Sequence, residues 1–360
     1  MARRGRLKVL LDGTPLLGSR TGVGRYTASL AEELAAMSDV DMRAVAFTLR
    51  GWRALRKVLP HGARARGAPV SARMLRKSWL RSQLPPVEMF AGLTDVVHGT
   101  NFVLPGRLRA AGVLTIHDLA FLDAPDELPP SDHELPTLVG ICAKRADAIC
   151  APTHSVAESI VDRLAVPREK VVVTPLGVDP AWFTARAADP VRRRLRLPKE
   201  YLLFVGASGP RKSIDWLLRA HESDPELPPL VFTGPGRFTP SERSISTGYL
   251  SEVELRSVVA GASALVLPSR DEGFGLPVLE AMACDVPVVC SDVPALRETS
   301  GGYATLVPHG DVPALAEGLR AAAQSDPAPA ELTEHRAHAA GFTWRRCAQA
   351  TVDAYRKALG

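Results

Sequence analysis

Short apolar runs alternate with amphipathic segments along most of the chain. Runs such as Leu7–Leu11 and Gly112–Ile116 are apolar on both sides, which is typical of buried strands in a parallel sheet. Segments such as Arg25–Met37 carry apolar residues on one helical face, which predicts helices that cover such a sheet. The alternation of strand and helix therefore predicts an α/β fold.

The same patterns place the remaining elements. Further strands are predicted at Ala44–Thr48, Ala148–Pro152, Val171–Thr174, Tyr201–Val205, Leu230–Thr233, Ile245–Tyr249, Ala264–Pro268, Val286–Cys290 and Tyr303–Val307. Further helices are predicted at Pro136–Ala146, Val156–Leu164, Ser213–His221, Pro277–Ala283, after Asp311 and after Trp344. Capping boxes are expected at Ser155 with Glu158 and at Ser251 with Glu254. The turn-rich segment Pro180–Pro198 divides the pattern into two domains, 1–180 and 181–341, followed by 342–360.

Composition narrows the class of protein. Hydrophobic residues make up 46% of the 360 residues, which suits two buried cores and excludes a disordered chain. No apolar run approaches the roughly 20 residues of a membrane-spanning helix. The apolar part of the N-terminus, Val9–Leu11, is too short for a signal peptide and is interrupted by Asp12. The spacing of the five cysteines matches no metal-binding motif, so we expect free thiols. We therefore expect a cytoplasmic protein.

The positive charge is concentrated in the first part of the chain. Residues 1–110 hold 19 Lys and Arg against 7 Asp and Glu, although the whole chain has a net charge of only +5. The densest segment, Arg64–Arg81, interleaves cations with apolar residues and predicts a basic amphipathic helix. Such a helix suits peripheral contact with an anionic membrane, but it also suits a solvated surface. No stacking platform accompanies the charge, which argues against nucleic acid.

One stretch, Leu265–Arg297, combines a strand, a glycine turn and a helix with two acids. Glu272 stands in the turn, and Glu280 follows eight positions later in the helix. Pro277 suits the first turn of that helix, where a missing N–H has no consequence. A helix start attracts phosphate because its N–H groups are unpaired. Many strand–turn–helix units nevertheless bind nothing, so the pattern alone predicts only a candidate anion site.

Two further loops and one histidine stand where ligands bind in α/β proteins. The glycines of Gly22-Val23-Gly24 precede a helix, so a diphosphate could approach the backbone closely. The loop at Gly206 leads to Arg211 and Lys212, which form either a diphosphate clamp or an ordinary pair of charges beside a helix. His117 follows a strand, as does His98, and strand ends face ligands in open sheets, although a lone histidine is more often structural.

Together these motifs resemble a known family. Leu265–Arg297 resembles the Glu-x7-Glu signature of the retaining glycosyltransferases of the GT-B fold, in particular family four, which includes many mannosyltransferases. The strings Thr21–Tyr26, His117-Asp118-Leu119 and Arg211-Lys212 resemble further motifs of that family. The resemblance covers nearly the full length and is strongest from Tyr201 onward. Leu176 and Ser213 depart from it, since the family usually has Asn at both places.

The resemblance implies a fold and a role for each domain. The GT-B fold has two Rossmann-like domains whose parallel sheets face an interdomain cleft. In this sequence 1–180 would be the acceptor-side domain, 181–341 would bind the nucleotide sugar, and the helix of 342–360 would cross back to the N-terminal domain.

The resemblance also assigns roles to residues. Glu272 would hold hydroxyls of the donor sugar, Glu280 the ribose hydroxyls, and His117 the sugar near its reacting carbon. Arg211 and Lys212 would neutralise the departing diphosphate. The remaining donor contacts, largely through the backbone, would come from Gly22, Val23, Gly24, Gly206, Gly248, Tyr249, Leu250, Phe274, Gly275 and Leu276. The chain's Asp-x-Asp, Asp39-Val40-Asp41, lies at the start of a strand and away from the expected cleft. We therefore expect no metal and no cofactor.

The implied activity is transfer of a hexose with retention of anomeric configuration, by a same-face route without a covalent intermediate. The first choice of donor is GDP-mannose, followed by UDP- and dTDP-sugars, and the acceptor would be a glycan or lipid-linked hydroxyl. Abundant Arg and Ala suggest a bacterial source, where such enzymes serve polysaccharide biosynthesis. Two alternatives stay open: a nucleotide-sugar epimerase of the same fold, and an inactive regulatory subunit that binds a nucleotide sugar.

Overall fold

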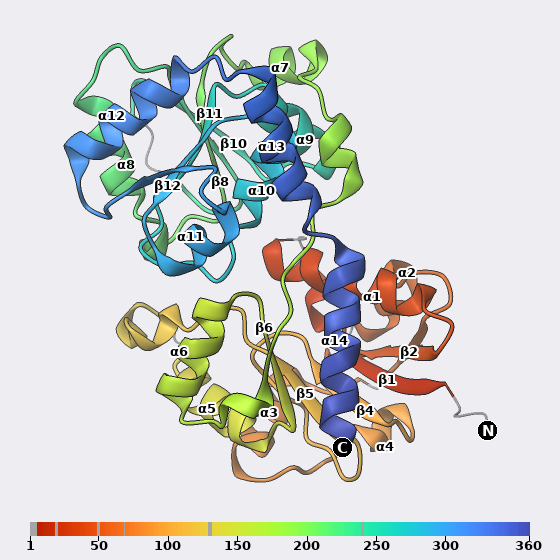
Figure 1. Cartoon of the computed structure of the whole chain (residues 1–360). Helices are drawn as coiled ribbons and strands as arrows, with labels where there is room; N and C mark the ends of the chain where they lie inside the picture. The colour runs from red at the N-terminus through yellow and green to blue at the C-terminus, as the bar shows by residue number, and fades with distance from the viewer. Residues whose placement is uncertain (1–5, 19–20, 49–50, 68, 129–131, 239–240) are drawn as a thin grey trace. The chain divides into compact units, whose positions relative to one another are not determined.

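The computed structural model describes residues 6–18, 21–48, 51–67, 69–128, 132–238 and 241–360. The chain forms two compact units (Figure 1). Unit 1 comprises Met1–Gly177 and Trp344–Gly360, and unit 2 comprises Val178–Thr343. Each unit is built on one parallel sheet with helices on both faces, so the predicted α/β class is confirmed.

The sheet of unit 1 has seven strands in the order β3-β2-β1-β4-β5-β6-β7. Their bounds are β1 Leu7–Asp12, β2 Val40–Val45, β3 Arg64–Arg66, β4 Val96–Gly99, β5 Ala111–Thr115, β6 Ala148–Ala151 and β7 Val171–Val173. All pairs are parallel, so every strand ends at the same edge. The strand order reverses between β1 and β4. In open α/β sheets this switch point, at the carboxyl edge, is where ligands bind.

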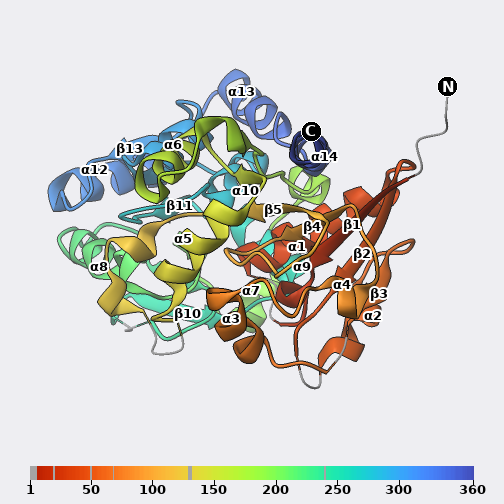
Figure 2. The ribbon, with the colours of Figure 1, turned by 90° about the horizontal axis from the view of Figure 1, so that it is seen from below.

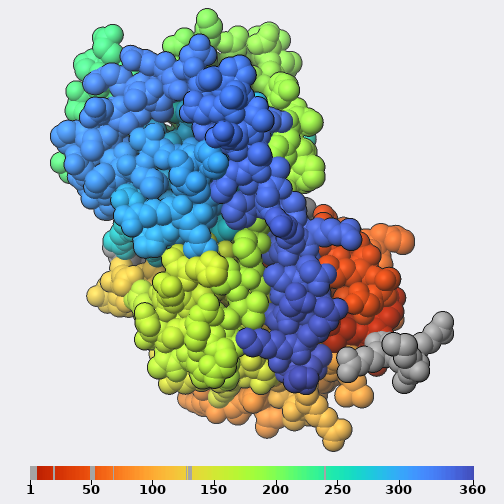
Figure 3. Space-filling view, in the orientation of Figure 1, coloured from red at the N-terminus to blue at the C-terminus, as the bar shows by residue number. Residues whose placement is uncertain are grey.

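Helices cover both faces of this sheet because its strands are apolar on both sides. Helices α1 (Gly22–Ala36) and α14 (Trp344–Leu359) pack on one face. Helices α3 (Ala72–Arg81), α5 (Leu135–Arg145) and α6 (His154–Leu164) pack on the other, and α3 and α5 lie side by side in Figure 2. Two short helices, α2 (Leu55–Val58) and α4 (Glu88–Ala91), complete the unit. In the space-filling view α14 forms a blue ridge on the outside of unit 1 (Figure 3).

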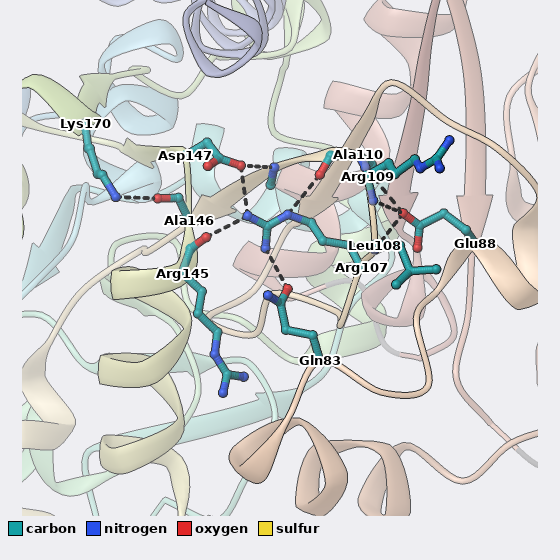
Figure 4. A network of polar contacts seen from close by, with 11 residues as sticks. Gln83, Glu88, Arg107, Leu108, Arg109, Ala110, Arg145, Ala146, Asp147 and Lys170 are labelled. Atoms are coloured by element: carbon teal, nitrogen blue, oxygen red, sulfur yellow. Dashed lines mark hydrogen bonds and ion pairs between the residues drawn. The ribbon is translucent and has the colours of Figure 1, made fainter.

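A polar network fixes the loops at the amino edge of this sheet (Figure 4). The Arg107 guanidinium donates to the carbonyl of Arg145 at 2.6 Å and pairs with Asp147 at 2.8 Å. The Glu88 carboxylate accepts the backbone N–H groups of Leu108 and Arg109 at 3.0 and 3.3 Å. The loops that precede β5 and β6 are therefore anchored, which fixes where these strands begin.

Three predictions for this unit are wrong in detail. The second strand runs from Val40 to Val45 and not over Ala44–Thr48, because polar side chains that form ion pairs interrupt its apolar pattern. Arg64–Arg81 is not one helix. It contains β3, then Gly67 with a φ of +128° and Pro69, and only then α3. Helix α6 is capped by Thr153, whose side chain accepts from Val156 N–H, and not by Ser155.

The sheet of unit 2 has six parallel strands in the order β10-β9-β8-β11-β12-β13. Their bounds are β8 Leu202–Val205, β9 Leu230–Thr233, β10 Ser244–Gly248, β11 Ala264–Leu267, β12 Val288–Ser291 and β13 Thr305–Val307. Its helices are α7 Asp189–Leu195, α8 Ile214–Glu222, α9 Glu252–Ala260, α10 Leu276–Ala283, α11 Pro294–Ser300, α12 Val312–Ala323 and α13 Pro329–Ala340. Helices α8 and α12 pack together, as do α10 and α13. The strand order reverses between β8 and β11, which marks a second switch point.

The cysteines and two helix caps agree with what the sequence predicts. The five cysteines are buried and free, which fits their expected role as thiols in apolar surroundings. The Ser251–Glu254 capping box at the start of α9 is present, and Asp311 caps α12. Within the described residues, no helix is both long and apolar enough to cross a lipid bilayer.

Candidate functional site

The carboxyl edge of unit 2 brings together two loops that lie far apart in the sequence. The first follows β8 and ends in the turn Pro210–Lys212, just before α8. The second follows β11 and leads through Ser269 and Glu272 into α10. Strands β8 and β11 are neighbours, so their loops emerge side by side. The N–H of Arg270 donates to the carbonyl of Arg211 at 2.9 Å, which ties the two loops together.

The predicted residues Arg211, Lys212 and Glu272 meet at this edge. Glu272 is only 8% exposed, and its Oε2 accepts from Arg211 at 3.0 Å. Its Oε1 accepts from Lys212 Nζ and, at 2.7 Å, from the hydroxyl of Ser269. Burial by itself would raise the pKa of Glu272, but the charges of Lys212 and Arg211 outweigh it and lower the pKa to about 2. The carboxyl group is therefore charged at neutral pH.

This triad has the electrostatics of an anion site. Two cations face one carboxylate, so the group keeps one net positive charge. The Arg211 guanidinium also donates to the carbonyl of Asp271 at 2.7 Å, which limits its freedom to rotate. Charges fixed before a ligand arrives need little reorganisation, and this is what stabilisation of a developing negative charge requires.

Helix α10 begins beside the triad. Its N-cap, Gly275, has a φ of +88°, and a Cβ there would lie 2.5 Å from Leu296 Cδ2, so only glycine fits without strain. Pro277 stands in the first turn, as expected. Phe274 and Leu276 on either side of Gly275 are buried. Glu280 lies in the middle of the helix and is 1% exposed.

The other predicted donor contacts of unit 2 lie at the same edge, at the ends of β8 and β10. The Gly206 N–H donates to the carbonyl of Thr233 at 2.9 Å, so this amide is used within the sheet. Gly248 ends β10 with a φ of +69°, after which Tyr249 is half exposed and Leu250 is buried. All four residues, Gly206, Gly248, Tyr249 and Leu250, stay predictions as donor contacts.

Ser213, which replaces the usual Asn of the family, stands at the start of α8 without capping it through its side chain. It occupies the N-cap position with a φ of +47°, but its side chain makes no capping hydrogen bond. Its hydroxyl lies 2.8 Å from His309 Nε2 instead. The substitution therefore links this loop to the loop after β13.

In unit 1, His117 follows β5 at the carboxyl edge. Its Nε2 lies 2.9 Å from the carbonyl of Thr100. Because a carbonyl can only accept, Nε2 carries the proton, and Nδ1 of the neutral ring is an acceptor. Burial lowers the pKa of His117 and favours this neutral form. His117 is thus suited to accept a hydrogen bond from a hydroxyl through Nδ1.

His98, the weaker candidate from the sequence, has a structural role. It is fully buried, with Nδ1 2.7 Å from the Tyr355 hydroxyl and Nε2 2.7 Å from Thr115 Oγ1. Burial lowers the pKa of His98 to about 3, so the ring stays neutral. The residue joins α14 to the sheet.

The glycine loop Gly22-Val23-Gly24 forms the first turn of α1. A Cβ at Gly22 would meet nothing within 4 Å, so packing does not require glycine there. Val23 and Gly24 line a pocket of about 320 Å³ within unit 1. Asp12 and Asn101 line it too, at the carboxyl ends of β1 and β4.

Sequence reasoning missed three residues at these edges: Ser269, Asp12 and Asn101. Each follows a predicted strand within a few positions, and this was the signal that selected His117. Asp12 was used only to argue against a signal peptide. The rule that ligands bind at strand ends would have identified all three.

Comparisons with known families cover most of both units. Residues 20–182 match the family described as "Glycosyltransferase Family 4". Residues 199–325 match the family described as "Glycosyl transferases group 1".

Among curated proteins, the chain is 28% identical to O-antigen chain mannosyltransferase B of Escherichia coli, over 97% of this chain and 100% of that protein. It is 31% identical to D-inositol 3-phosphate glycosyltransferase of Actinosynnema mirum, over 74% of this chain and 73% of that protein.

Among solved structures, sucrose-phosphate synthase from Thermosynechococcus elongatus matches with a TM-score of 0.74 at 20% identity, covering 98% of each chain. Anabaena Alr3699/HepE in complex with UDP-glucose matches with a TM-score of 0.68 at 15% identity, covering 96% of this chain and 98% of that one. Both likenesses concern the fold.

Proposed function

The chain belongs to the family-four, group 1 glycosyltransferases and has their GT-B architecture, and from this membership we propose which reaction it performs. It transfers a hexose from a nucleoside diphosphate sugar to a hydroxyl of a glycan or lipid-linked acceptor, with retention of anomeric configuration. The observation that carries the proposal is the triad of Arg211, Lys212 and the buried Glu272 at the switch point of unit 2.

The triad provides what departure of a diphosphate needs. When the bond between the anomeric carbon and the phosphate oxygen breaks, both electrons stay on the diphosphate. Lys212, Arg211 and the first N–H groups of α10, near Gly275, stabilise this growing negative charge. Glu272 holds both cations in position and, in this proposal, binds hydroxyls of the donor sugar. Glu280 binds the ribose.

We infer the route to retention from the chemistry of Glu272. A covalent route would need a carboxylate free to attack the anomeric carbon. Glu272 has a pKa of about 2 and accepts from two cations, so it is a weak nucleophile. We therefore favour attack by the acceptor hydroxyl on the face that the diphosphate leaves, with the hydroxyl proton passing to a phosphate oxygen. His117 supports the sugar through Nδ1.

Metal independence belongs to the same proposal. The carboxylates of Asp39 and Asp41, the chain's Asp-x-Asp, are engaged elsewhere. Asp41 pairs with Arg43 at 2.7 Å and also with Arg64, and Asp39 pairs with Arg356 at 3.4 Å. These ion pairs favour a structural role for the Asp-x-Asp, and in this proposal Arg211 and Lys212 supply the positive charge at the reaction site.

Mannose from GDP-mannose is the first choice of sugar because two curated relatives are named mannosyltransferases. The complex of Alr3699/HepE with UDP-glucose makes UDP-sugars the next choice. A thermal-shift screen against GDP-, UDP-, ADP- and dTDP-sugars tests this, since a ligand of the folded state raises Tm once its concentration exceeds Kd. One donor should raise Tm in wild type and in Lys199→Ala, an exposed matched control, and much less in Lys212→Ala. No stabilisation by any donor would contradict the proposal.

The same assays distinguish a transferase from the two alternatives, an epimerase and an inactive regulatory subunit. With a stabilising donor in hand, a transferase forms a new glycoside only when an acceptor is added. An epimerase would change the donor sugar without an acceptor. An inactive regulatory subunit would bind the donor and turn over neither substrate.

Contact with an anionic membrane through Arg64–Arg81 is a further part of the proposal, restricted to the helix that the segment contains. Helix α3 buries Leu75 and Trp79. Its opposite face exposes Arg73, Lys77 and Met74, the last of which is 71% exposed. Cations around an exposed apolar side chain suit the surface of an anionic bilayer. Such a contact would bring the enzyme to a lipid-linked acceptor.

A further inference from the structure

The pocket of unit 1 lies at the switch point of its own sheet. Asp12 ends β1, and Asn101 follows β4, the two strands between which the order reverses. The start of α1 and the inner side of α3 close the pocket. A volume of about 320 Å³ is at the lower end of the range for small-molecule sites, where one or two sugar rings would fit.

The lining of this pocket is half polar and half apolar. Its charged and amide side chains are Asp12, Arg76 and Asn101. Its apolar wall is formed by Phe47, Trp79 and Val103, and the two aromatic rings meet edge to face at 5.2 Å. Sugars present hydroxyls at their edges and C–H groups on their faces. A pocket lined by both polar and aromatic side chains is therefore the complement of a sugar ring.

Asn101 gives an independent sign that the pocket takes a polar ligand. Its Oδ1 is buried, and no residue in the described part of the chain donates a hydrogen bond to it. Such an acceptor typically costs about 1–3 kcal/mol, so folded proteins seldom retain one without a use. The next residue, Phe102, has a φ of +60°, an unfavourable conformation for a bulky side chain. The chain thus tolerates strain in order to hold Asn101 at the pocket.

The charges in the pocket distinguish between kinds of ligand. Arg76 is the cation among the residues that line the pocket, and its charge acts on Asp12. Asp12 lies across the same pocket, and its carboxyl accepts the Thr14 N–H at 2.9 Å. A phosphate here would meet one cation and one carboxylate, so attraction and repulsion would largely cancel. A neutral sugar can use both groups, because carboxylates accept from hydroxyls and guanidinium groups donate to them.

We propose that this pocket is the acceptor subsite and holds the uncharged terminal sugar ring of a glycan, with its hydroxyls on Asp12, Asn101 and Arg76 and its apolar face against Phe47 and Trp79. The inference rests on the proposed glycosyl transfer and specifies its acceptor. A neutral acceptor would distinguish this chain from the relatives named D-inositol 3-phosphate glycosyltransferase.

Asn101 also provides the probe. It is the only asparagine in the chain, so asparagine-selective ¹⁵N labelling gives a single side-chain NH₂ signal. The labelled protein is titrated with neutral methyl glycosides of mannose, glucose, N-acetylglucosamine and rhamnose, and with mannose 6-phosphate. We expect at least one neutral glycoside to shift the Asn101 signal saturably, and mannose 6-phosphate to bind more weakly than methyl mannoside. The proposal is overturned if no neutral glycoside shifts the signal, or if the phosphorylated sugar binds more tightly.

Two variants test the residues. Arg76→Gln removes an exposed charge and leaves the core intact, and Asp12→Ala removes the carboxylate without adding a second asparagine. Each should weaken binding of the best glycoside about tenfold or more, the usual effect of losing a charge-assisted hydrogen bond. Asp353→Ala, on the exposed side of α14, should bind it normally. Unchanged binding by Arg76→Gln, which is expected to fold, contradicts the proposal even if Asp12→Ala does not fold.

Donor and acceptor readouts separate this inference from the proposed function. In Arg76→Gln, Asp12→Ala and Asp353→Ala, stabilisation by the nucleotide sugar should match wild type, because the side chains proposed to hold its diphosphate and ribose, Arg211, Lys212 and Glu280, lie in unit 2. In transfer assays, Asn101→Ala should raise KM for the acceptor about tenfold or more and leave KM for the donor unchanged. If the donor binds and is transferred but acceptor KM does not change, the acceptor subsite is elsewhere. If no donor binds, the proposed function itself fails.

Discussion

Replacing Glu272 by Gln keeps the shape of the side chain and removes the charge that holds Arg211 and Lys212. The pKa of Glu272 is about 2 in the folded protein, against an ordinary value of 4.5. At about 1.4 kcal/mol per pKa unit, its surroundings favour the charged form by about 3 kcal/mol. Loss of one partner from a buried ion pair costs a similar amount, roughly 3–5 kcal/mol, because the remaining charges are left unpaired.

The variant should therefore unfold more easily at neutral pH. About 3 kcal/mol corresponds to a decrease in Tm of roughly 6–12 °C for a domain of 150–250 residues. Glu252→Gln is the matched control, since Glu252 is half exposed and lies 4.0 Å from Arg256. Its free energy of unfolding should change by less than about 1 kcal/mol. Calorimetry, which resolves the transitions of separate domains, measures both variants.

The effect depends on pH in a defined direction. Because the folded-state pKa of Glu272 lies below its ordinary value, its stabilisation is complete above about pH 5 and is lost as the pH falls towards 2. The difference in Tm between wild type and Glu272→Gln should therefore shrink from pH 6 to pH 3. Transfer by Glu272→Ala should fall by about a hundredfold or more. Equal Tm values at pH 7, or a difference that does not change with pH, would refute the reasoning about the triad.

Three further predictions follow from the site and the fold. Transfer should proceed unchanged in EDTA, and a large recovery on adding Mg²⁺ or Mn²⁺ to the treated enzyme would contradict metal independence. Gly275→Ala should destabilise unit 2 by more than the control Gly302→Ala. Both glycines have a φ of +88°, but a Cβ at Gly275 would also clash with Leu296, whereas a Cβ at Gly302 would meet no neighbour. Equal changes in Tm would show that the contact with Leu296 does not matter. The protein should co-sediment with vesicles containing phosphatidylglycerol and not with pure phosphatidylcholine, and Lys77→Glu in α3 should weaken this; binding that ignores lipid charge would contradict the proposed contact.

Local patterns predicted most of the strands and helices. Leu202–Val205 and Ala264–Leu267 are apolar on both faces, and such runs occur almost only in buried parallel strands. The capping box at Ser251 was visible because both of its partners lie within one helical turn. Errors arose where polar residues entered an element, as at the second strand, or where Pro69 interrupted a basic segment that looked continuous.

The geometry of the site depended on contacts that no local pattern contains. Lys212 and Glu272 are 60 positions apart and meet because β8 and β11 are neighbours in the sheet. The sequence identified both residues, but it assigned the cations to phosphate and the acid to sugar and did not predict their ion pairs. A position after a strand marks Asp12 and Asn101 one by one in the sequence, but the pocket that they share follows from the pairing of β1 with β4.

The place of α14 has a consequence for how the chain acquires its structure during synthesis. Residues 344–360 belong to unit 1, and the hydroxyl of Tyr355 reaches the fully buried His98. On the ribosome, residues 1–177 emerge first, but they lack this helix until the whole of unit 2 has been made. The part of the first sheet that α14 covers, over β5, β6 and β7, therefore stays bare while the second unit folds, and such surfaces are prone to aggregation. Unit 2 is continuous in sequence and can complete its folding before α14 is made. The unit translated second can therefore be the first to fold completely.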